Sequence, residues 1–453
     1  MSGRSPERAR TAARPRAAAG SGVDRRPIEV RLAEAGLPPL PRSAWLQVDL
    51  DALGANFGLV RRLVGPGVSI EPVVKADAYG HGMVPIARAL VALGAGGLCV
   101  AALDEALALR DAGVAGRINV LYPIPPALAP AAAEADVAVA VGDAAGLARL
   151  LDGLAERGAR PARRLDLELE IDTGLGRGGV RPEAAVEVAR AIASAPAARL
   201  AGVWTHLQAS EDPARTAAQI ERYETTLRYL AAAGIDVSRR HVAASGGILV
   251  GTIPVYDAVR PGLMTYGLVP DEFAPGSLPA AADLRPVLSL RARPVRVADL
   301  PAGSGLSYGP TFTTDRPSRI ATLPIGYGDG WPRSLSNRAD ALIRGRRVPI
   351  VGNVAMDGIL ADVTDVPGPP VDVDDEFVLL GRQDAQEIPA SELARTRTTN
   401  SWEVVTAMSG RLPRVYHAAA GPMAVRTLAG AEDRWLGSSS GTATSAISRS
   451  TRS

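Results

Sequence analysis

The sequence predicts an α/β protein in which an N-terminal (β/α)8 TIM barrel is followed by a C-terminal mainly β domain. Strand-like apolar runs and helical patterns alternate over about 220 residues, which is typical of parallel βαβ units. After Arg285-Pro286 the pattern changes to short strand-like runs separated by Gly, Pro and Asp turns, which is typical of an all-β domain. The chain length of 453 residues also exceeds what one compact core usually holds.

The first strand is expected at residues 46–50, before a helix that Asp51 caps and that runs to Leu63. Further strands are expected near residues 70–75, 97–101, 118–121, 137–141, 165–171, 200–206, 241–244 and 258–260. Helices are expected between most of them, at residues 83–93, 104–112, 144–157, 181–194 and 213–233. Eight strands after the first favour a closed barrel, with the first strand paired outside it, and a doubly wound open sheet is the alternative.

The second domain begins near residue 286, and its strands are expected at residues 288–297, 318–325, 341–351, 359–363 and 377–380. Residues 1–42 are rich in Ala, Arg, Pro and Gly without a sustained period, so we expect a disordered leader. The expected domains are the barrel at 43–285 and the β domain at 286–432, and a disordered tail rich in Ser, Thr and Gly at 433–453.

Composition excludes several classes of protein. A net charge of +2 gives no electrostatic case for nucleic acid or a membrane surface. No apolar run is long enough to span a membrane, and the N-terminus lacks the apolar segment of a signal peptide, so a soluble cytoplasmic protein is expected. Cys99 is the single cysteine and the histidines lack ligand spacing, so we predict no metal site.

Lys75 is the only lysine in the chain, and every other cationic side chain is an arginine. It ends an apolar run and is followed by a glycine-rich turn, which is how a buried strand delivers a side chain to the rim of a barrel. Arginine cannot replace lysine where a deprotonated amine must attack a carbonyl group. The sequence therefore indicates a reactive amine at Lys75.

Other polar side chains also follow predicted strands, and the carboxyl ends of barrel strands share one face. They are Arg177, His206, Ser245 and Arg260. Ser245 is followed by Gly246 and Arg260 by Pro261-Gly262, and such glycine turns leave backbone N–H groups free to cradle a phosphate. A lysine beside a phosphate cradle points to pyridoxal 5'-phosphate as cofactor.

The chain resembles the alanine racemase family of fold-type III pyridoxal-phosphate enzymes over about residues 45–430. The resemblance rests on motifs that occur in the family's order along the chain. These are Val74–Gly82, Asp172–Arg177, Thr205-His206, Ala243–Ser245, Val259–Gly262, Ser307–Gly309, Gly326–Gly330, Met356-Asp357 and Pro413–Tyr416.

The resemblance implies a two-base racemisation of a small amino acid, most simply L-alanine to D-alanine, in a head-to-tail homodimer. Lys75 would hold the cofactor and act on one face of the substrate carbon, and Tyr308 of the partner subunit would act on the other face. His206 and the arginines would supply the positive surroundings that a tyrosine base needs. The implied cofactor-binding residues are Lys75, Tyr79, Arg177, His206, Ser245, Arg260, Gly262, Leu263 and Tyr416.

The substrate carboxylate would be bound by Arg177 and the backbone N–H of Met356, according to the same resemblance. Tyr327 and Arg333 would line the route by which the substrate enters. Glu170 and Asp357 would support the site or this route. Glu170 stands where the family commonly has a carbamylated lysine, so we predict a direct Glu170–Arg177 ion pair.

Three further positions depart from the family pattern and leave the substrate open. They are Ala244, Asn353 and Gly358. The alternatives are a racemase or epimerase of another amino acid such as serine, and a catalytically weak homologue that binds pyridoxal phosphate. A decarboxylase of the same fold type is disfavoured, because its cysteine-centred motif is missing from the sequence.

Overall fold

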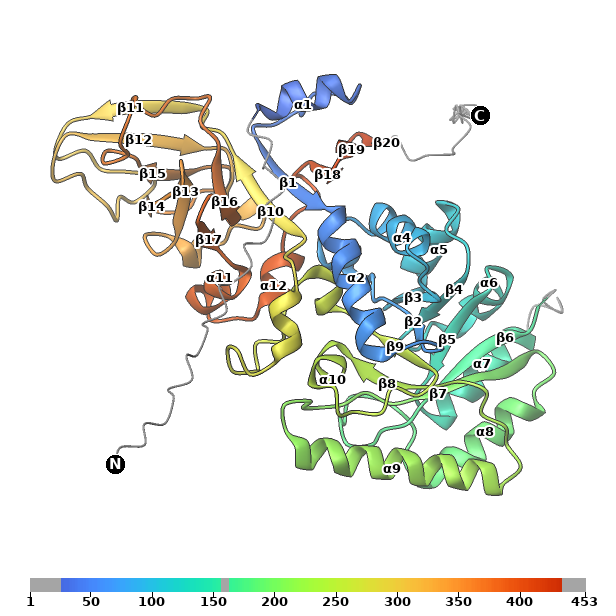
Figure 1. The fold of residues 1–453 in the computed structure, drawn as a ribbon. Helices are drawn as coiled ribbons and strands as arrows, with labels where there is room; N and C mark the ends of the chain where they lie inside the picture. Colours follow the sequence, from blue (N-terminus) through green and yellow to red (C-terminus); the bar gives the residue numbers. More distant parts are fainter. Residues whose placement is uncertain (1–25, 156–162, 434–453) are drawn as a thin grey trace, which may run out of the picture.

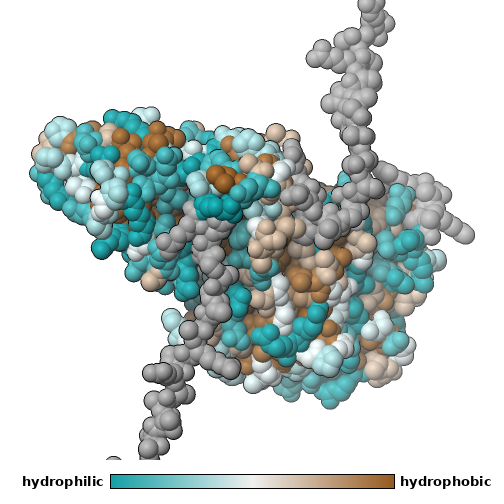
Figure 2. Space-filling view, turned by 45° about the horizontal axis from the view of Figure 1, so that its top comes forward, coloured by the Kyte–Doolittle hydropathy of each residue, from teal (hydrophilic) through white to brown (hydrophobic). Residues whose placement is uncertain are grey.

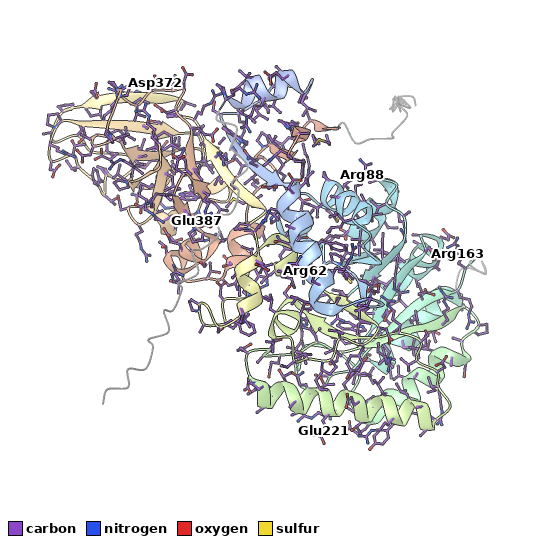
Figure 3. The ribbon with its side chains drawn as sticks, viewed as in Figure 1. Arg62, Arg88, Arg163, Glu221, Asp372 and Glu387 are labelled. Atoms are coloured by element: carbon purple, nitrogen blue, oxygen red, sulfur yellow. The ribbon has the colours of Figure 1, made fainter. Side chains whose placement is uncertain are left out.

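A computed structural model describes residues 26–155 and 163–433. The barrel and the C-terminal β domain lie side by side (Figure 1). Arg163 and Glu221 mark the barrel and Asp372 and Glu387 mark the β domain (Figure 3).

Eight parallel strands form the barrel. They are β2 (Ser69–Ile70), β3 (Gly97–Val100), β4 (Arg117–Val120), β5 (Val137–Val141), β6 (Leu165–Glu170), β7 (Ala198–Trp204), β8 (Arg240–Ala244) and β9 (Ala258–Arg260). Neighbours pair in chain order from β3 to β9, β9 pairs β2, and a parallel bridge between Val73 and Cys99 closes the ring. The predicted closed barrel is therefore confirmed. Helices cover the outside of these strands and side chains fill the interior, where charged and polar groups such as Glu168 and His241 are buried beside apolar ones.

The outer layer contains the expected helices and two more. It comprises α2 (Leu50–Val64), α4 (Met83–Ala92), α5 (Leu103–Asp111), α6 (Ala129–Glu134), α7 (Ala144–Ala155), α8 (Ala185–Ser194), α9 (Pro213–Ala232) and α10 (Ser245–Val250). The sequence did not predict α6 and α10, which have only six residues each. Asp51 was predicted to cap α2, but the cap is Asp49, whose carboxylate accepts from the Ala52 N–H at 2.9 Å.

Strand β1 (Ala44–Asp49) lies outside the barrel, as expected. It pairs antiparallel with β10 (Leu288–Ala292) and parallel with β18 (Arg414–Ala418). The first strand of the chain thus belongs to the sheet of the C-terminal domain, although its residues fall in the range that the sequence assigned to the barrel.

The remaining strands of the C-terminal domain are β11 (Arg296–Leu300), β12 (Ser318–Leu323), β13 (Asp340–Ile343), β14 (Arg346–Val351), β15 (Ile359–Asp362), β16 (Phe377–Gln383), β17 (Gln386–Ile388), β19 (Gly421–Thr427) and β20 (Gly430–Asp433). The strand predicted at 288–297 is divided at Pro294 into β10 and β11. The strand predicted at 341–351 is divided into β13 and β14 by a turn at Arg344 and Gly345, both of which have positive φ. Two short helices, α11 (Ala390–Arg397) and α12 (Ser401–Thr406), were not predicted.

The leader is ordered from residue 26, so the prediction of a disordered segment is wrong for residues 26–42. Helix α1 (Ile28–Glu34) buries Ile28 and Leu32 against Trp45 and Val425. Apolar residues spaced by one helical turn supply the contact that the overall composition of the leader conceals. The rest of the predicted leader, and the tail after residue 433, lie outside the described residues.

Apolar surface on the face shown in Figure 2 is divided among small areas over both domains. Among the described residues, no helix combines the length and the apolar character that crossing a membrane requires.

Candidate active site

Lys75 directly follows Val73 and Val74, which pair with β3 of the barrel. Val73 forms a parallel bridge with Cys99, and the Val74 N–H donates to the Cys99 carbonyl at 2.8 Å. The turn that follows is left-handed. Ala76, Asp77 and Ala78 have φ values of 52°, 54° and 54°, and Tyr79 has φ 53°. For L-residues this conformation costs roughly 1–2 kcal/mol each, so surrounding contacts must stabilise it.

The Lys75 amine is half-buried at the barrel mouth. Burial, and after it the Arg177 guanidinium, lower the pKa of Lys75, while Glu105 opposes them. A lowered pKa makes the neutral amine more available as a nucleophile or base.

Arg177 and Glu170 do not form the predicted ion pair, because no contact within 4 Å joins these two described side chains. The Arg177 guanidinium lies over the Tyr122 ring, 5.4 Å from its centroid. Glu170 ends β6 with only 6% of its surface exposed, and burial raises its pKa although Arg177 and Arg260 oppose this. The glutamate influences both guanidiniums through space, but its short side chain does not reach Arg177.

Arg260 is the innermost charged group at the mouth, with 2% of its surface exposed. It donates to the Thr205 carbonyl at 2.9 Å and to His241 Nδ1, and it packs over the Trp204 ring at 4.7 Å. Because Nδ1 accepts from a guanidinium, the His241 hydrogen lies on Nε2, which donates to Glu168 at 3.0 Å. This buried chain of hydrogen bonds fixes the orientation of Arg260.

His206 does not supply the positive charge that the sequence analysis assigned to it. The pKa of His206 is lowered to about 3. Burial is the largest cause, and the positive charges of Arg260, Arg177 and Lys75 act in the same direction. The imidazole is therefore neutral at physiological pH, and the positive potential at the mouth comes from the two arginines.

The predicted phosphate cradle is assembled at the ends of β8 and β9. Ser245 Oγ accepts from the N–H groups of Gly262 and Met264 at 2.9 and 3.2 Å. Within the described residues the Leu263 N–H has no partner. A Cβ at Gly262 would lie 2.7 Å from the Tyr79 hydroxyl, so only glycine leaves room between them. Hydroxyl groups and a free N–H in one small space fit a phosphate group.

Tyr416 is fully buried, but its hydroxyl hydrogen bonds to the His81 carbonyl at 2.9 Å. The structure therefore places it against the turn that follows Lys75. A donated bond from Tyr416 to a phosphate would require this bond to break.

Apart from the buried Tyr416, the predicted residues of the C-terminal domain lie on its surface. Tyr308, Met356 and Tyr327 are 77%, 52% and 43% exposed. Arg333 donates to the Val354 carbonyl at 3.3 Å, and Asp357 pairs with Arg411. No hydrogen bond or ion pair joins any of these five to Lys75, Arg177 or Arg260 within the described part of one chain.

The loop that carries Tyr308 is nevertheless well held. The Asn353 amide donates to the carbonyls of Tyr308 and Gly309 at 2.8 and 3.1 Å. Ser307 Oγ donates to the Asn353 carbonyl at 2.6 Å. An exposed tyrosine on a braced loop is available to a second protein molecule.

Family models for the N-terminal and C-terminal domains of alanine racemase match residues 48–270 and 287–416. The chain belongs to the alanine racemase family. It is 42% identical over 377 residues to the alanine racemase of Symbiobacterium thermophilum, covering 83% of this chain and 97% of that one. It is 39% identical over 384 residues to that of Thermobifida fusca, covering 82% and 98%.

Solved structures of the family share the fold. The Bacillus anthracis alanine racemase with bound L-Ala-P matches with a TM-score of 0.78 and 33% identity, covering 86% of this chain and 98% of that one. The enzyme of a D-cycloserine-producing Streptomyces lavendulae matches with a TM-score of 0.75 and 35% identity, covering 84% and 98%.

Three side chains that hold the site residues in place were not predicted from the sequence: Glu168, His241 and Glu105. Glu168 and His241 lie in the barrel interior, and Glu105 accepts from the Ala76 N–H at 2.6 Å. One signal was available, because Asp166, Glu168 and Glu170 alternate with leucines along β6 and therefore share one face of the strand. No sequence pattern marks the partner that each acid takes.

We predict that stability falls as the pH decreases from about 6.5 toward 4. Burial lowers the pKa values of His81, His206 and His241 to about 4, 3 and 4. The unfolded chain binds protons at these histidines from about pH 6.5 downward, whereas the folded chain does not, so acid favours unfolding. Urea unfolding at several pH values measures this dependence.

The variant His241→Gln isolates one of the three histidines. Its free energy of unfolding should vary less steeply with pH, by about one proton. A slope equal to that of the parent protein would contradict the assignment of His241 as a buried neutral histidine.

Proposed function

We propose that this protein interconverts L-alanine and D-alanine with pyridoxal 5'-phosphate as cofactor, acting as a head-to-tail homodimer. One observation carries the proposal. The only lysine of the chain presents a half-buried amine of lowered pKa at the barrel mouth, which it shares with Arg177, Arg260 and the Ser245–Gly262 cradle. Family membership adds the reaction, since the relatives are named alanine racemase.

Pyridoxal phosphate, when bound, withdraws electrons from the substrate and so acidifies the hydrogen on its α-carbon. Lys75 would hold the cofactor and then move this proton at its Nζ on one face of the carbon. The Tyr79 and Ser245 hydroxyls and the Leu263 N–H would bind the phosphate, and Gly262 keeps the space open for it. Arg260 would face the ring nitrogen without giving up its own proton, since a guanidinium remains charged.

Arg177 would bind the substrate carboxylate. Its guanidinium is exposed and has no carboxylate partner within 4 Å in the described chain, so both edges of the group are available. The Met356 N–H, which also has no partner among the described residues, would add a second donor.

Racemisation requires a second base on the opposite face of the carbon. Tyr308 of the partner subunit would supply it. The exposure of this side chain and the bracing of its loop by Asn353 support a contact across subunits. Arg177 and Arg260 would stabilise the tyrosinate, because His206 is neutral.

A racemase of a larger amino acid such as serine is the second candidate, and Gly358 favours it. A Cβ at this position would meet only the Leu323 carbonyl, at 3.9 Å, so the segment next to Met356 leaves open space.

Exchange in deuterated water tests the function. The purified protein with pyridoxal phosphate should show a visible absorbance band and should incorporate deuterium into L-alanine while its optical rotation is lost. Exchange into L-serine alone would select the second candidate. A band without exchange into either amino acid would contradict racemisation, and no band at all would contradict cofactor binding.

Mixed dimers test the role of Tyr308. Lys75→Arg and Tyr308→Phe should each be nearly inactive alone, because each lacks one of the two bases. If Tyr308 crosses to the partner, each mixed dimer has one intact site of two, and the isolated mixed dimer should regain up to about half of the parent activity. Coexpression with two different affinity tags isolates the mixed dimers, and an inactive mixed dimer would contradict the crossing.

A further inference from the structure

The left-handed turn after Lys75 is held partly by its own backbone. The N–H groups of Ala78, Gly80 and Gly82 donate to the carbonyls of Val74, Ala76 and Asp77 at 2.9, 3.0 and 2.8 Å. These bonds close the turn but do not attach it to the rest of the protein. Glu105 attaches the beginning of the turn through the Ala76 N–H.

The hairpin of β18 and β19 attaches the rest of the turn to the C-terminal domain. Arg426 Nη1 donates to both carboxylate oxygens of Asp77, at 2.7 and 2.9 Å. Asp77 also accepts from the Met83 N–H at 2.8 Å, which connects it to the start of α4. Arg414 donates to the Gly80 carbonyl at 3.0 Å, and Tyr416 donates to that of His81.

The fit between hairpin and turn is close enough to require glycine. A Cβ at Gly82 would lie 1.8 Å from the Tyr416 hydroxyl and 3.1 Å from Arg426 Nη1. A Cβ at Gly80 would lie 2.2 Å from the Val405 carbonyl of α12. The β18–β19 hairpin and helix α12 of the C-terminal domain therefore both pack directly against the turn.

We propose that Arg426 is a positioning residue, which holds the left-handed turn through Asp77 and thereby sets the location of the Lys75 amine. Arg426 lies on β19, beyond residue 416, where the family match ends. The inference rests on the proposed role of Lys75, because only a reactive amine needs this placement.

Arg426 is a better subject for a test than its neighbours. Arg414 is almost fully buried and donates to four backbone carbonyls, so its loss would disturb the whole junction. The Arg426 side chain is 32% exposed, and its ion pair with Asp77 can be removed with little loss of packing.

The single lysine makes the position of the amine directly measurable. An acylating reagent modifies only Lys75 and the N-terminal amine of the full-length chain, and peptide mass analysis separates the two. The reagent reacts with the neutral amine, so the pH midpoint of Lys75 labelling reports its surroundings, where Arg177, Glu105 and Cys99 are the charged or titratable groups that act on it.

In Arg426→Met the turn should relax and the amine should move toward solvent and away from Arg177. The labelling midpoint should then rise by about one pH unit, which corresponds to about tenfold slower labelling at a fixed lower pH. Asp77→Asn should shift the labelling midpoint in the same direction, because it removes the charge that pairs with Arg426. The turn should still form locally, since asparagine tolerates left-handed φ and its side-chain oxygen can still accept from the Met83 N–H. The double variant should shift it no further than the single variants do.

Arg344→Met is the matched control. Arg344 forms a two-oxygen pair with Asp375 at 2.7 and 2.8 Å, and its side chain is 31% exposed. Its loss should alter the midpoint of urea unfolding about as much as Arg426→Met but leave the labelling midpoint unchanged.

Unchanged labelling in both Arg426→Met and Asp77→Asn would overturn the proposal, whatever happens to stability. A shift in Asp77→Asn without one in Arg426→Met would also overturn it, because the aspartate would then act without the arginine. Asp77→Asn decides the question if Arg426→Met does not fold. The measurement uses the full chain without added cofactor, so its result does not depend on whether the protein racemises alanine.

Discussion

The placement of one amine at the barrel mouth depends on a backbone conformation that L-residues avoid. Four consecutive non-glycine residues after Lys75 have positive φ, and the residues that follow contact the β18–β19 hairpin. The strain is tolerated because backbone bonds, Glu105 and the C-terminal domain act on the same few residues. The turn that follows Lys75 is thus held by a domain that contributes no strand to the barrel.

Electrostatics at the mouth follow from burial. Burial and the Arg177 guanidinium lower the pKa of the half-buried Lys75 amine, and burial together with Arg260 and Arg177 keeps His206 neutral. Arg260 donates to His241, which in turn donates to Glu168, and these buried bonds fix the orientation of the guanidinium. Arg260 therefore stays in place although it is almost fully buried. The Arg177 and Arg260 guanidiniums suit a phosphate, a carboxylate and a developing tyrosinate.

Much of this architecture could be predicted because local signals carry it. The alternation of apolar runs predicted eight barrel strands, and the residues after those strands predicted Lys75, Ser245 and Arg260. Contacts between distant segments could not be predicted in the same way. Nothing near Glu170 indicates that its carboxylate stops short of Arg177, and nothing near Asp77 indicates Arg426, which lies 349 residues further on.

Helix α1 shows a second limit. Averaged composition over residues 1–42 resembles a disordered segment, whereas Ile28, Leu32 and Leu37 pack α1 and the residues after it in one cluster with Trp45. The Tyr308 loop shows a third. Its sequence resembles the family motif, but only the structure shows that the tyrosine is exposed and that Asn353 braces it.

Chemical trapping tests the central claim most directly. The protein is loaded with pyridoxal phosphate, reduced with borohydride and digested, and the peptide that carries the added mass is identified. If Lys75 holds the cofactor, one pyridoxyl group per chain is expected, on the peptide that contains Lys75. Added mass on the N-terminal amine, or on no peptide, would contradict it.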